Sequence, residues 1–366
     1  MAMTTVSNPA SVADRYQTYF NKKLLHVQTD ELVLDQFAVQ ADLPSKSSAR
    51  TMRFFKPERA HSQLYAAPTH ANSVAALTEG VAISTYREND WTKVDVTLKQ
   101  YGEATKISDI VDMTDAFMAV KQNIELMGRD AALHADTVTR NALVGSTHPD
   151  GSTTPLTHGS NGTNGCELFT TATNGVCINS GTSATNFTNL SGATQAQGSV
   201  TRMFVLMAAT RLAVNKAPKL KKGRYVCVLP PQIRHDLVQD DDYQNAFQGQ
   251  GAAGIYKGAM ADIDGFIFVE ATNPFIEDET YGTYDSTDDN ADGLIYTTFF
   301  LGAGAYGVPK LAGTKSPLKP QVFINDKPDK SDPLNQFIIA GWKAYYMAIG
   351  LDSLNIVAGR SKSTFV

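Results

Sequence analysis

The chain has 366 residues, of which 42% are hydrophobic and 19% charged, and this composition predicts a folded protein with a buried core. The net charge is −5 and the only dense basic cluster is 219–224, which argues against a sequence-independent nucleic-acid binder. The first residues lack a basic start, and no apolar run reaches about 18 residues, so we expect no signal peptide, no transmembrane helix and a protein made in a cytoplasm.

The first predicted element is an amphipathic helical arm over 10–37, where apolar residues recur at spacings of three and four. Strands are predicted over 51–57 and 93–108, and they could pair as the two sides of a long hairpin. In the second strand the alternation changes phase across 100–102, beside a glycine, which indicates a β-bulge that bends the strand. The intervening segment, 58–92, is longer than most loops, and such loops are usually functional. A hairpin arm of this kind has no core of its own, so a neighbouring subunit would have to cover it.

The strongest predicted helix spans 115–144 and would be a rod of roughly 45 Å. Thr114 or Asp115 can cap its start, and Gly145 can end it. Its apolar stripe is narrow, which predicts a helix that lies along a sheet or a partner. The stripe consists of Phe117, Val120, Ile124, Met127, Ala131, Ala135, Val138 and Ala142.

Residues 146–198 are rich in Gly, Ser, Thr and Asn and nearly free of charge, which indicates an insertion or long surface loop. A helix is predicted over 199–216. The residues expected to share one of its faces are Met203, Leu206, Thr210 and Ala213.

The remaining elements alternate between strand and helix, which predicts a compact α/β unit over 199–312. Strand signals return over 319–325 and 335–358, and we expect a C-terminal strand pair that rejoins the sheet beneath the long helix. The elements expected within the α/β unit are strands over 225–229, 263–270 and 294–301 and one helix over 232–247.

Motifs for catalysis are missing from the sequence. The seven histidines show no metal-ligand spacing, and His134 is expected to be a packed or surface helix residue. Neither G-x-S-x-G nor a P-loop occurs, and Gly302–Gly307 reads as a tight strand connection because Pro309 would break a phosphate-binding helix. The run Asp240–Asp242 reads as a solvated helix face. We therefore expect no catalytic residue and no cofactor.

The cysteines give no disulfide framework, since there are three of them and no C-x-x-C pair. Cys227 is expected to be a small buried hydrophobe. Cys166 and Cys177 flank a Gly/Thr/Asn-rich stretch and could pair, although a reducing compartment works against a disulfide.

One stretch resembles the opening of a calcium loop. Asp288, Asn290 and Asp292 occupy the first three oxygen-ligand positions, and a glycine follows. Phe299 stands where a bidentate glutamate is required, and the flanks read as strands. An acidic surface turn is the alternative that we favour over a metal site.

The order of elements resembles the Hong Kong 97-type fold of tailed-phage major capsid proteins. Two sequence blocks go further and are similar to the phage N-four type of major capsid protein. The first comprises 77–81, Val94–Gly102 and Ile107–Asp109, and the second comprises Gly341–Tyr346 and Leu354–Val357. The segment 146–198 departs from that family.

The resemblance implies an α+β Hong Kong 97-type capsid fold and the major capsid protein of an icosahedral phage head. Its subunits would form hexamers and pentamers, enclose double-stranded DNA without specific contacts, and meet portal, scaffold and decoration proteins, with no membrane. The implied parts are an N-terminal arm (1–50), an extended hairpin loop (51–108), a spine helix with the peripheral domain (109–145), the insertion (146–198), an axial domain (199–318) and C-terminal peripheral strands (319–366).

Two alternatives remain open. An encapsulin-like nanocompartment shell protein would share the fold, and an enzyme of unknown class could use the loop 146–198. Within the arm, the candidates for intersubunit ion pairs are Arg53, Lys56, Glu58, Glu79 and Arg87, and exposed solubilising charge is the competing interpretation.

Overall fold

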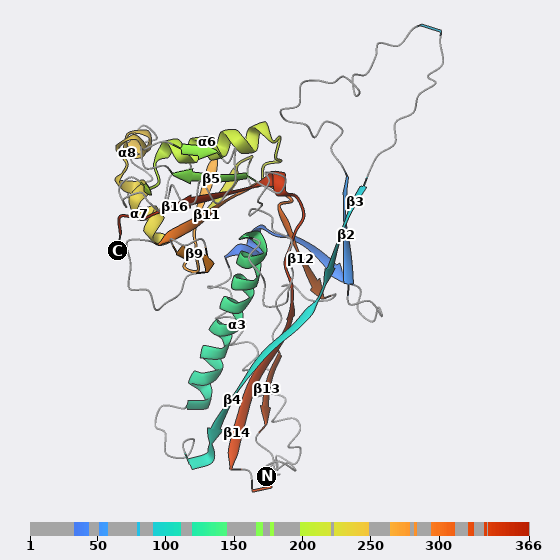
Figure 1. Cartoon of the computed structure of the whole chain (residues 1–366). Helices are drawn as coiled ribbons and strands as arrows, with labels where there is room; N and C mark the ends of the chain where they lie inside the picture. The colour runs from blue at the N-terminus through green and yellow to red at the C-terminus, as the bar shows by residue number, and fades with distance from the viewer. Residues whose placement is uncertain are drawn as a thin grey trace, which may run out of the picture.

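The computed structural model describes residues 33–43, 51–57, 79–80, 91–110, 119–144, 166–170, 176–178, 198–220, 223–248, 264–278, 282–283, 294–311, 321–325, 333–334 and 336–365. These residues form a body built on a large sheet, a leg in which a long helix lies along strands, and a hairpin that projects away from both (Figure 1). Within the described residues, no helix is both long and apolar enough to cross a membrane.

The body contains an eight-stranded sheet with helices packed on it. Its central strands β7 (Tyr225–Leu229), β11 (Ile295–Leu301) and β16 (Ile356–Ser361) are buried at every position, as their nearly continuous apolar sequences require. The other strands are β5 (Cys166–Thr170), β6 (Val176–Ile178), β8 (Phe266–Glu270), β9 (Phe275–Asp278) and β10 (Gly282–Thr283), and the helices are α6 (Arg202–Val214), α7 (Pro231–Gln239) and α8 (Asp241–Gln248).

The leg consists of helix α3 (Ala119–Val144) and the three-stranded antiparallel sheet β13–β14–β4. The predicted stripe is confirmed where side chains are described, since none of its members from Ile124 to Val138 is more than 2% exposed. The strands are β13 (Gln321–Asn325), β14 (Phe337–Tyr346) and β4 (Lys99–Ser108). The prediction that C-terminal strands lie beneath the long helix is therefore confirmed for β13 and β14.

A small sheet joins the body to the leg. In it, β1 (Val39–Leu43) runs parallel to β12 (Tyr306–Leu311), which also pairs with β15 (Ile349–Gly350). The 3-10 helix η1 (Leu34–Phe37) precedes β1, and a second 3-10 helix, η4 (Ser353–Asn355), leads into β16. The glycine-rich stretch after Leu301 is the turn between β11 and β12, as predicted, and Gly304 there has φ +72°.

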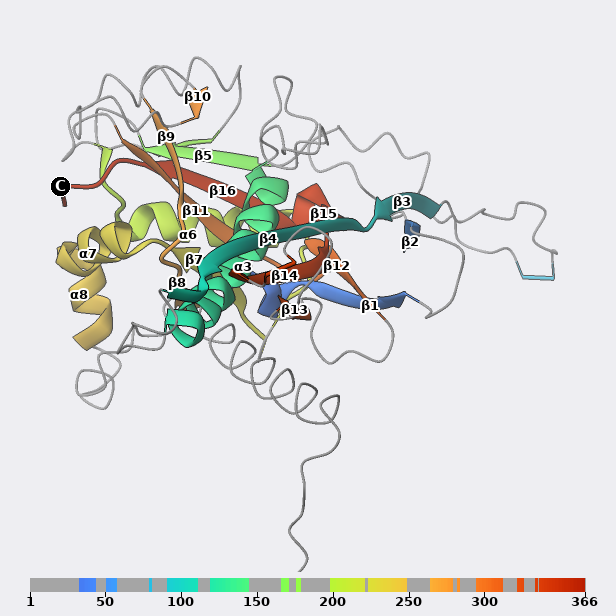
Figure 2. The ribbon, with the colours of Figure 1, turned by 90° about the horizontal axis from the view of Figure 1, so that it is seen from below.

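The projecting hairpin pairs β2 (Thr51–Pro57) with β3 (Trp91–Thr97). The predicted pairing is thus correct for 93–97 but wrong for 99–108, because β4 pairs with β14. Figure 2 shows β3 and β4 as one long ribbon that leaves the leg and enters the hairpin. The predicted β-bulge at 100–102 is wrong, because β4 pairs residue by residue with β14 from Lys99 to Ser108. The chain instead passes from one sheet to the other at Leu98, two residues earlier.

Helix α6 buries a different face from the predicted one. The residues buried against the sheet are Phe204, Val205, Ala208 and Leu212. The four residues of the predicted face are exposed, namely Met203, Leu206, Thr210 and Ala213. The helix is apolar on both sides, so its sequence spacing does not determine which side is buried.

The single helix predicted over 232–247 is two helices, α7 and α8, separated at Asp240. The prediction that Asp240 belongs to a solvated helix face is wrong. One of its carboxylate oxygens accepts a hydrogen bond from the backbone N–H of Asp242, and the other accepts one from the backbone N–H of Arg202. Asp240 therefore caps α8 and holds the start of α6, as aspartate commonly does at an N-cap.

Strand β16 was expected in the C-terminal strand pair, and this expectation is wrong. It lies inside the large sheet, antiparallel to β11 and parallel to β5. The apolar run of β16 predicts burial but contains no signal for its partners, which are distant in sequence.

The register of β5 and β6 excludes the Cys166–Cys177 pair. Cys177 is opposite Phe169, three positions along the strand from Cys166, or about 10 Å. A disulfide requires Cα atoms within about 7 Å. Cys227 is buried as predicted, and burial raises the pKa of its thiol well above the ordinary value.

Candidate assembly surface

The hairpin β2–β3 has one face that anchors it to the small sheet β1–β12–β15. Met52 and Phe54 are opposite Val96 and Val94, and Val96 is only 1% exposed. The Phe54 ring lies so close to Gly307 of β12 that a Cβ atom on that glycine would be 3.0 Å from Phe54 Cζ. The anchor depends on the absence of a side chain at this position.

The opposite face of the hairpin is called the outer face. Its residues are Thr51, Arg53 and Phe55 of β2 and Trp91, Lys93, Asp95 and Thr97 of β3. At its base, Thr51 Oγ1 and Thr97 Oγ1 share a hydrogen bond of 2.9 Å. Arg53 donates from Nε and Nη2 to the two carboxylate oxygens of Asp95, at 2.6 and 2.7 Å. The hydrogen bond from Arg53 lowers the pKa of Asp95.

Two large apolar side chains lie farther along the outer face. Phe55 is 60% exposed and Trp91 is 55% exposed, and both lie toward the end of the hairpin that is remote from Thr51 and Thr97. A two-stranded hairpin is at best marginally stable by itself in water. Its exposed aromatic pair is the kind of surface that a protein partner covers.

The predicted ion-pair residues have different outcomes. Arg53 has its partner, Asp95, within the same hairpin. Lys56 is in β2, and Glu79 is exposed in a turn with Gly80. Glu58 and Arg87 lie outside the described residues. Phe55 and Trp91 were missed, although their place on the same side of neighbouring strands was a usable signal.

A polar cluster is buried where η1 crosses α3. Asp136 Oδ1 accepts a 3.0 Å hydrogen bond from the backbone N–H of Leu34, and Tyr346 Oη and Thr139 Oγ1 share one of 2.8 Å. Tyr306 donates to the Leu34 carbonyl. Burial raises the pKa of Asp35 to about 6 and also raises the pKa of Asp136. The contact between η1 and α3 therefore contains two carboxyl groups that resist ionisation.

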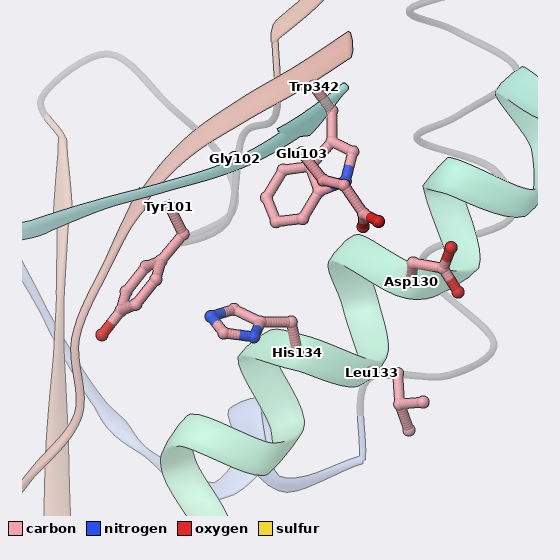
Figure 3. A pocket seen from close by; sticks show the side chains of 7 residues that line it. All are labelled: Tyr101, Gly102, Glu103, Asp130, Leu133, His134 and Trp342. Atoms are coloured by element: carbon pink, nitrogen blue, oxygen red, sulfur yellow. The ribbon is translucent and has the colours of Figure 1, made fainter. Parts of the chain in front are cut away.

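A cavity of about 430 Å³ lies on the other side of α3, against β4 and β14. Tyr101, Glu103 and Trp342 reach it from the strands, and Asp130 and His134 reach it from the helix (Figure 3). The Tyr101 and His134 ring centroids are 4.5 Å apart, and those of His134 and Trp342 are 6.3 Å apart. His134 is a packed helix residue, as predicted.

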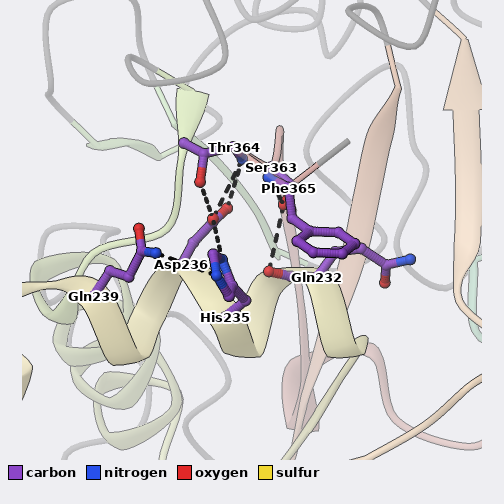
Figure 4. Close-up of polar contacts among 7 residues, drawn as sticks. All are labelled: Gln232, His235, Asp236, Gln239, Ser363, Thr364 and Phe365. Atoms are coloured by element: carbon purple, nitrogen blue, oxygen red, sulfur yellow. Dashed lines mark hydrogen bonds and ion pairs between the residues drawn. The ribbon is translucent and has the colours of Figure 1, made fainter.

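The chain near its C-terminal end is fixed to α7. The Asp236 carboxylate accepts hydrogen bonds from the backbone N–H and the hydroxyl of Thr364, and the Phe365 ring meets His235 edge-on at 5.3 Å (Figure 4). His235 Nδ1 and Asp236 Oδ1 are 3.6 Å apart, and Gln239 Nε2 is 3.2 Å from His235 Nε2. This arrangement holds residues 363–365 against α7.

No cluster suited to metal binding occurs among the described residues. The calcium candidates Asp288, Asn290 and Asp292 lie outside them. Phe299, at the twelfth position of that motif, is only 3% exposed within β11. The strand reading of this flank is thereby confirmed.

The body, the leg and the projecting hairpin together define the mixed α/β fold of phage capsid proteins. A structure titled the capsid of Ralstonia phage GP4 is similar to this chain with a TM-score of 0.61 and 13% identity, over 91% of this chain and 92% of that one. The cyanophage P-SCSP1u capsid has a TM-score of 0.56 and 14% identity, over 91% of this chain and 89% of that one. A native GTA particle capsid has a TM-score of 0.54 and 10% identity, over 90% of each chain. At these identities the likeness establishes the fold. No family model and no curated protein matches the sequence.

Proposed function

We propose that the chain is the major capsid protein of a tailed phage, a self-assembling structural subunit of an icosahedral head and not an enzyme. The observation that carries this proposal is the likeness to phage capsid structures, which extends over about nine tenths of both chains for the Ralstonia phage protein. The leg alone has more residues than the unmatched tenth of the chain, so the likeness extends beyond the body.

The finer assignment is the Hong Kong 97-type fold and the phage N-four type family. In this assignment β2–β3 is the extended loop, α3 is the spine helix, and the unit around β7, β11 and β16 belongs to the axial domain. One structural relation supports it. The block Gly341–Tyr346 pairs residue by residue with Lys99–Ala104, so the two family-like blocks are neighbours in one sheet.

The hairpin is proposed to act as an arm between subunits. Its outer face carries Phe55 and Trp91, and burying apolar surface stabilises a contact by about 25 cal/mol per Å². Heterologous contacts that close by rotation produce rings, which hexamers and pentamers require. Lys56, Glu58, Glu79 and Arg87 are proposed to form ion pairs across this contact.

The further partners follow from the proposed family alone. They are portal, scaffold and decoration proteins and packaged double-stranded DNA, with assembly in the host cytoplasm and a final place in the virion. A nanocompartment shell would share the fold, but the similar structures named above come from phage and GTA capsids. The phage head is therefore the reading that we adopt.

Assembly of the purified chain tests the proposal. We expect megadalton particles or capsomers in sedimentation velocity and negative-stain images. A variant that lacks residues 58–92, which include Trp91, should leave the unit 199–312 folded and form no shells. Normal particles from this deletion would refute the arm, and a strictly monomeric wild type at every salt concentration would refute the proposed function.

A further inference from the structure

The cavity between α3, β4 and β14 has the chemistry of a cation site. Two aromatic rings of the kind that attract cations, from Tyr101 and Trp342, line it beside the imidazole of His134. A cation placed near the face of an aromatic ring is attracted by the ring's quadrupole, most strongly by that of tryptophan. The aromatic lining therefore favours a positively charged group over an anion.

The charges around the cavity favour the same sign. Glu103 and Asp130 line it from opposite elements, and no lysine or arginine is among the described residues that line it. Two carboxylates without a lysine or arginine in the described lining repel phosphate and attract an ammonium or guanidinium group. Nucleic acid is therefore a poor occupant of this site.

A buried donor points to the rest of the ligand. Trp342 is only 5% exposed, and its Nε1–H has no hydrogen-bond partner among the described residues. A buried donor without an acceptor is destabilising. A ligand that brings a carbonyl oxygen together with its cation would satisfy this donor.

The mouth of the cavity has an apolar side. Leu133 lines it and is 45% exposed. Lysine and arginine place an apolar stem along such surfaces while the charged group reaches a polar site. A hydrated metal ion has no such stem, so the site fits a basic amino-acid residue better than an inorganic cation.

We propose that this cavity receives the lysine or arginine side chain of a second copy of the chain. The rings of Tyr101 and Trp342 and the carboxylates of Glu103 and Asp130 hold the cationic group, and Trp342 donates to a carbonyl oxygen that the partner brings into the cavity. The choice of a second copy rests on the proposed function, because a shell packs identical chains side by side. Such packing presents a weak ligand at a high effective concentration.

A fluorescence titration tests the chemistry of the cavity without assembly. The sequence has two tryptophans, so Trp91→Phe leaves Trp342 as the only indole. Unassembled Trp91→Phe chain is titrated with arginine amide and, in parallel, with citrulline amide, its uncharged analogue. We expect a saturable change of emission with arginine amide at a midpoint at least about fivefold lower than with citrulline amide.

Matched variants identify the carboxylates. Glu103→Gln and Asp130→Asn, each in the Trp91→Phe background, should raise the arginine amide midpoint at least about threefold. Asp241→Asn, which removes an exposed carboxylate on α8, should leave it unchanged. Equal midpoints for the two probes, or no effect of either cavity variant in a chain with an unchanged circular dichroism spectrum, would overturn the cation site.

Assembled particles test the source of the side chain. If a second copy fills the cavity, arginine amide should no longer change the emission of Trp342 in intact particles, and the response should return when particles are dissociated. An undiminished response in intact particles would overturn the second-copy occupant. If no particles form, the proposed function and the second-copy occupant both fail, while the titration of free chains still decides the chemistry of the cavity.

Discussion

Replacing Phe55 and Trp91 together by alanine removes the two large apolar side chains from the outer face of the hairpin. An aromatic side chain buries roughly 150–250 Å², and these two are 60% and 55% exposed in the single chain. A partner that covers them would bury on the order of 200 Å² more, or about 5 kcal/mol per hairpin at ~25 cal/mol per Å².

The assay is the lowest protein concentration at which particles form, measured by sedimentation velocity. A difference of ~1.4 kcal/mol corresponds to a tenfold change in an equilibrium constant. Even if the partner buries only part of this aromatic surface, the double variant should therefore need about a tenfold higher concentration or more to form particles. The melting temperature of the free chain should change little, since the exposed parts of these side chains stabilise nothing within it.

Two controls separate assembly from folding. The conservative pair Phe55→Tyr and Trp91→Phe should assemble at nearly the wild-type concentration. Val238→Ala, at a residue that is 44% exposed on α7, removes apolar surface away from the hairpin and should also have little effect. Assembly of the double alanine variant at the wild-type concentration would refute the role of the outer face.

Three further changes test the chain's interior. Asp35→Asn should flatten part of the pH dependence of the free energy of unfolding. Because burial raises the pKa of Asp35 to about 6, its stabilising contribution is complete below about pH 4 and is lost as the pH rises through 6. The loss should lower the free energy of unfolding of the wild type by roughly 2–3 kcal/mol. Urea denaturation at pH 4 and 7.5 measures this, and an unchanged pH dependence would contradict it. Asp240→Ala should destabilise the body by about 1–2 kcal/mol through loss of the α8 cap, whereas Asp241→Ala should not, and equal effects of the two would argue against the cap. Gly359→Ala should cost about 1–3 kcal/mol, since the added Cβ would lie 2.6 Å from Phe204 Cε1, and Phe204→Leu in the same chain should recover part of that loss; no loss in the single variant would contradict the packing.

Local patterns in the sequence predicted the elements whose burial is one-sided. Helix α3 is the best case, because one narrow stripe of small and apolar residues can face only one way. The strand signals of β7 and β11 were correct for a different reason, because short apolar runs are typical of strands buried on both sides.

Other features depend on contacts between residues that are distant in sequence. Helix α6 is apolar all round, so only the sheet that it covers decides which face is buried. The break at Asp240 depends on the backbone of Arg202, which is 38 positions away. Likewise, no local pattern could show that β16 inserts between β11 and β5.

The candidate sites show the same division. The arm was predicted from its strands, but Phe55 and Trp91 become neighbours only through the hairpin register. The cation cavity was missed entirely, because Tyr101, His134 and Trp342 come from three separate parts of the chain. Sequence periodicity cannot bring such residues together.

A cryo-electron microscopy map of particles assembled from the purified chain is the most direct test of the central claim. The proposed function predicts an icosahedral shell in which the outer face of each β2–β3 hairpin lies against a neighbouring copy, with Phe55 and Trp91 buried in that contact. A chain that stays monomeric under all assembly conditions, or a shell in which the outer face is exposed to solvent, would contradict it.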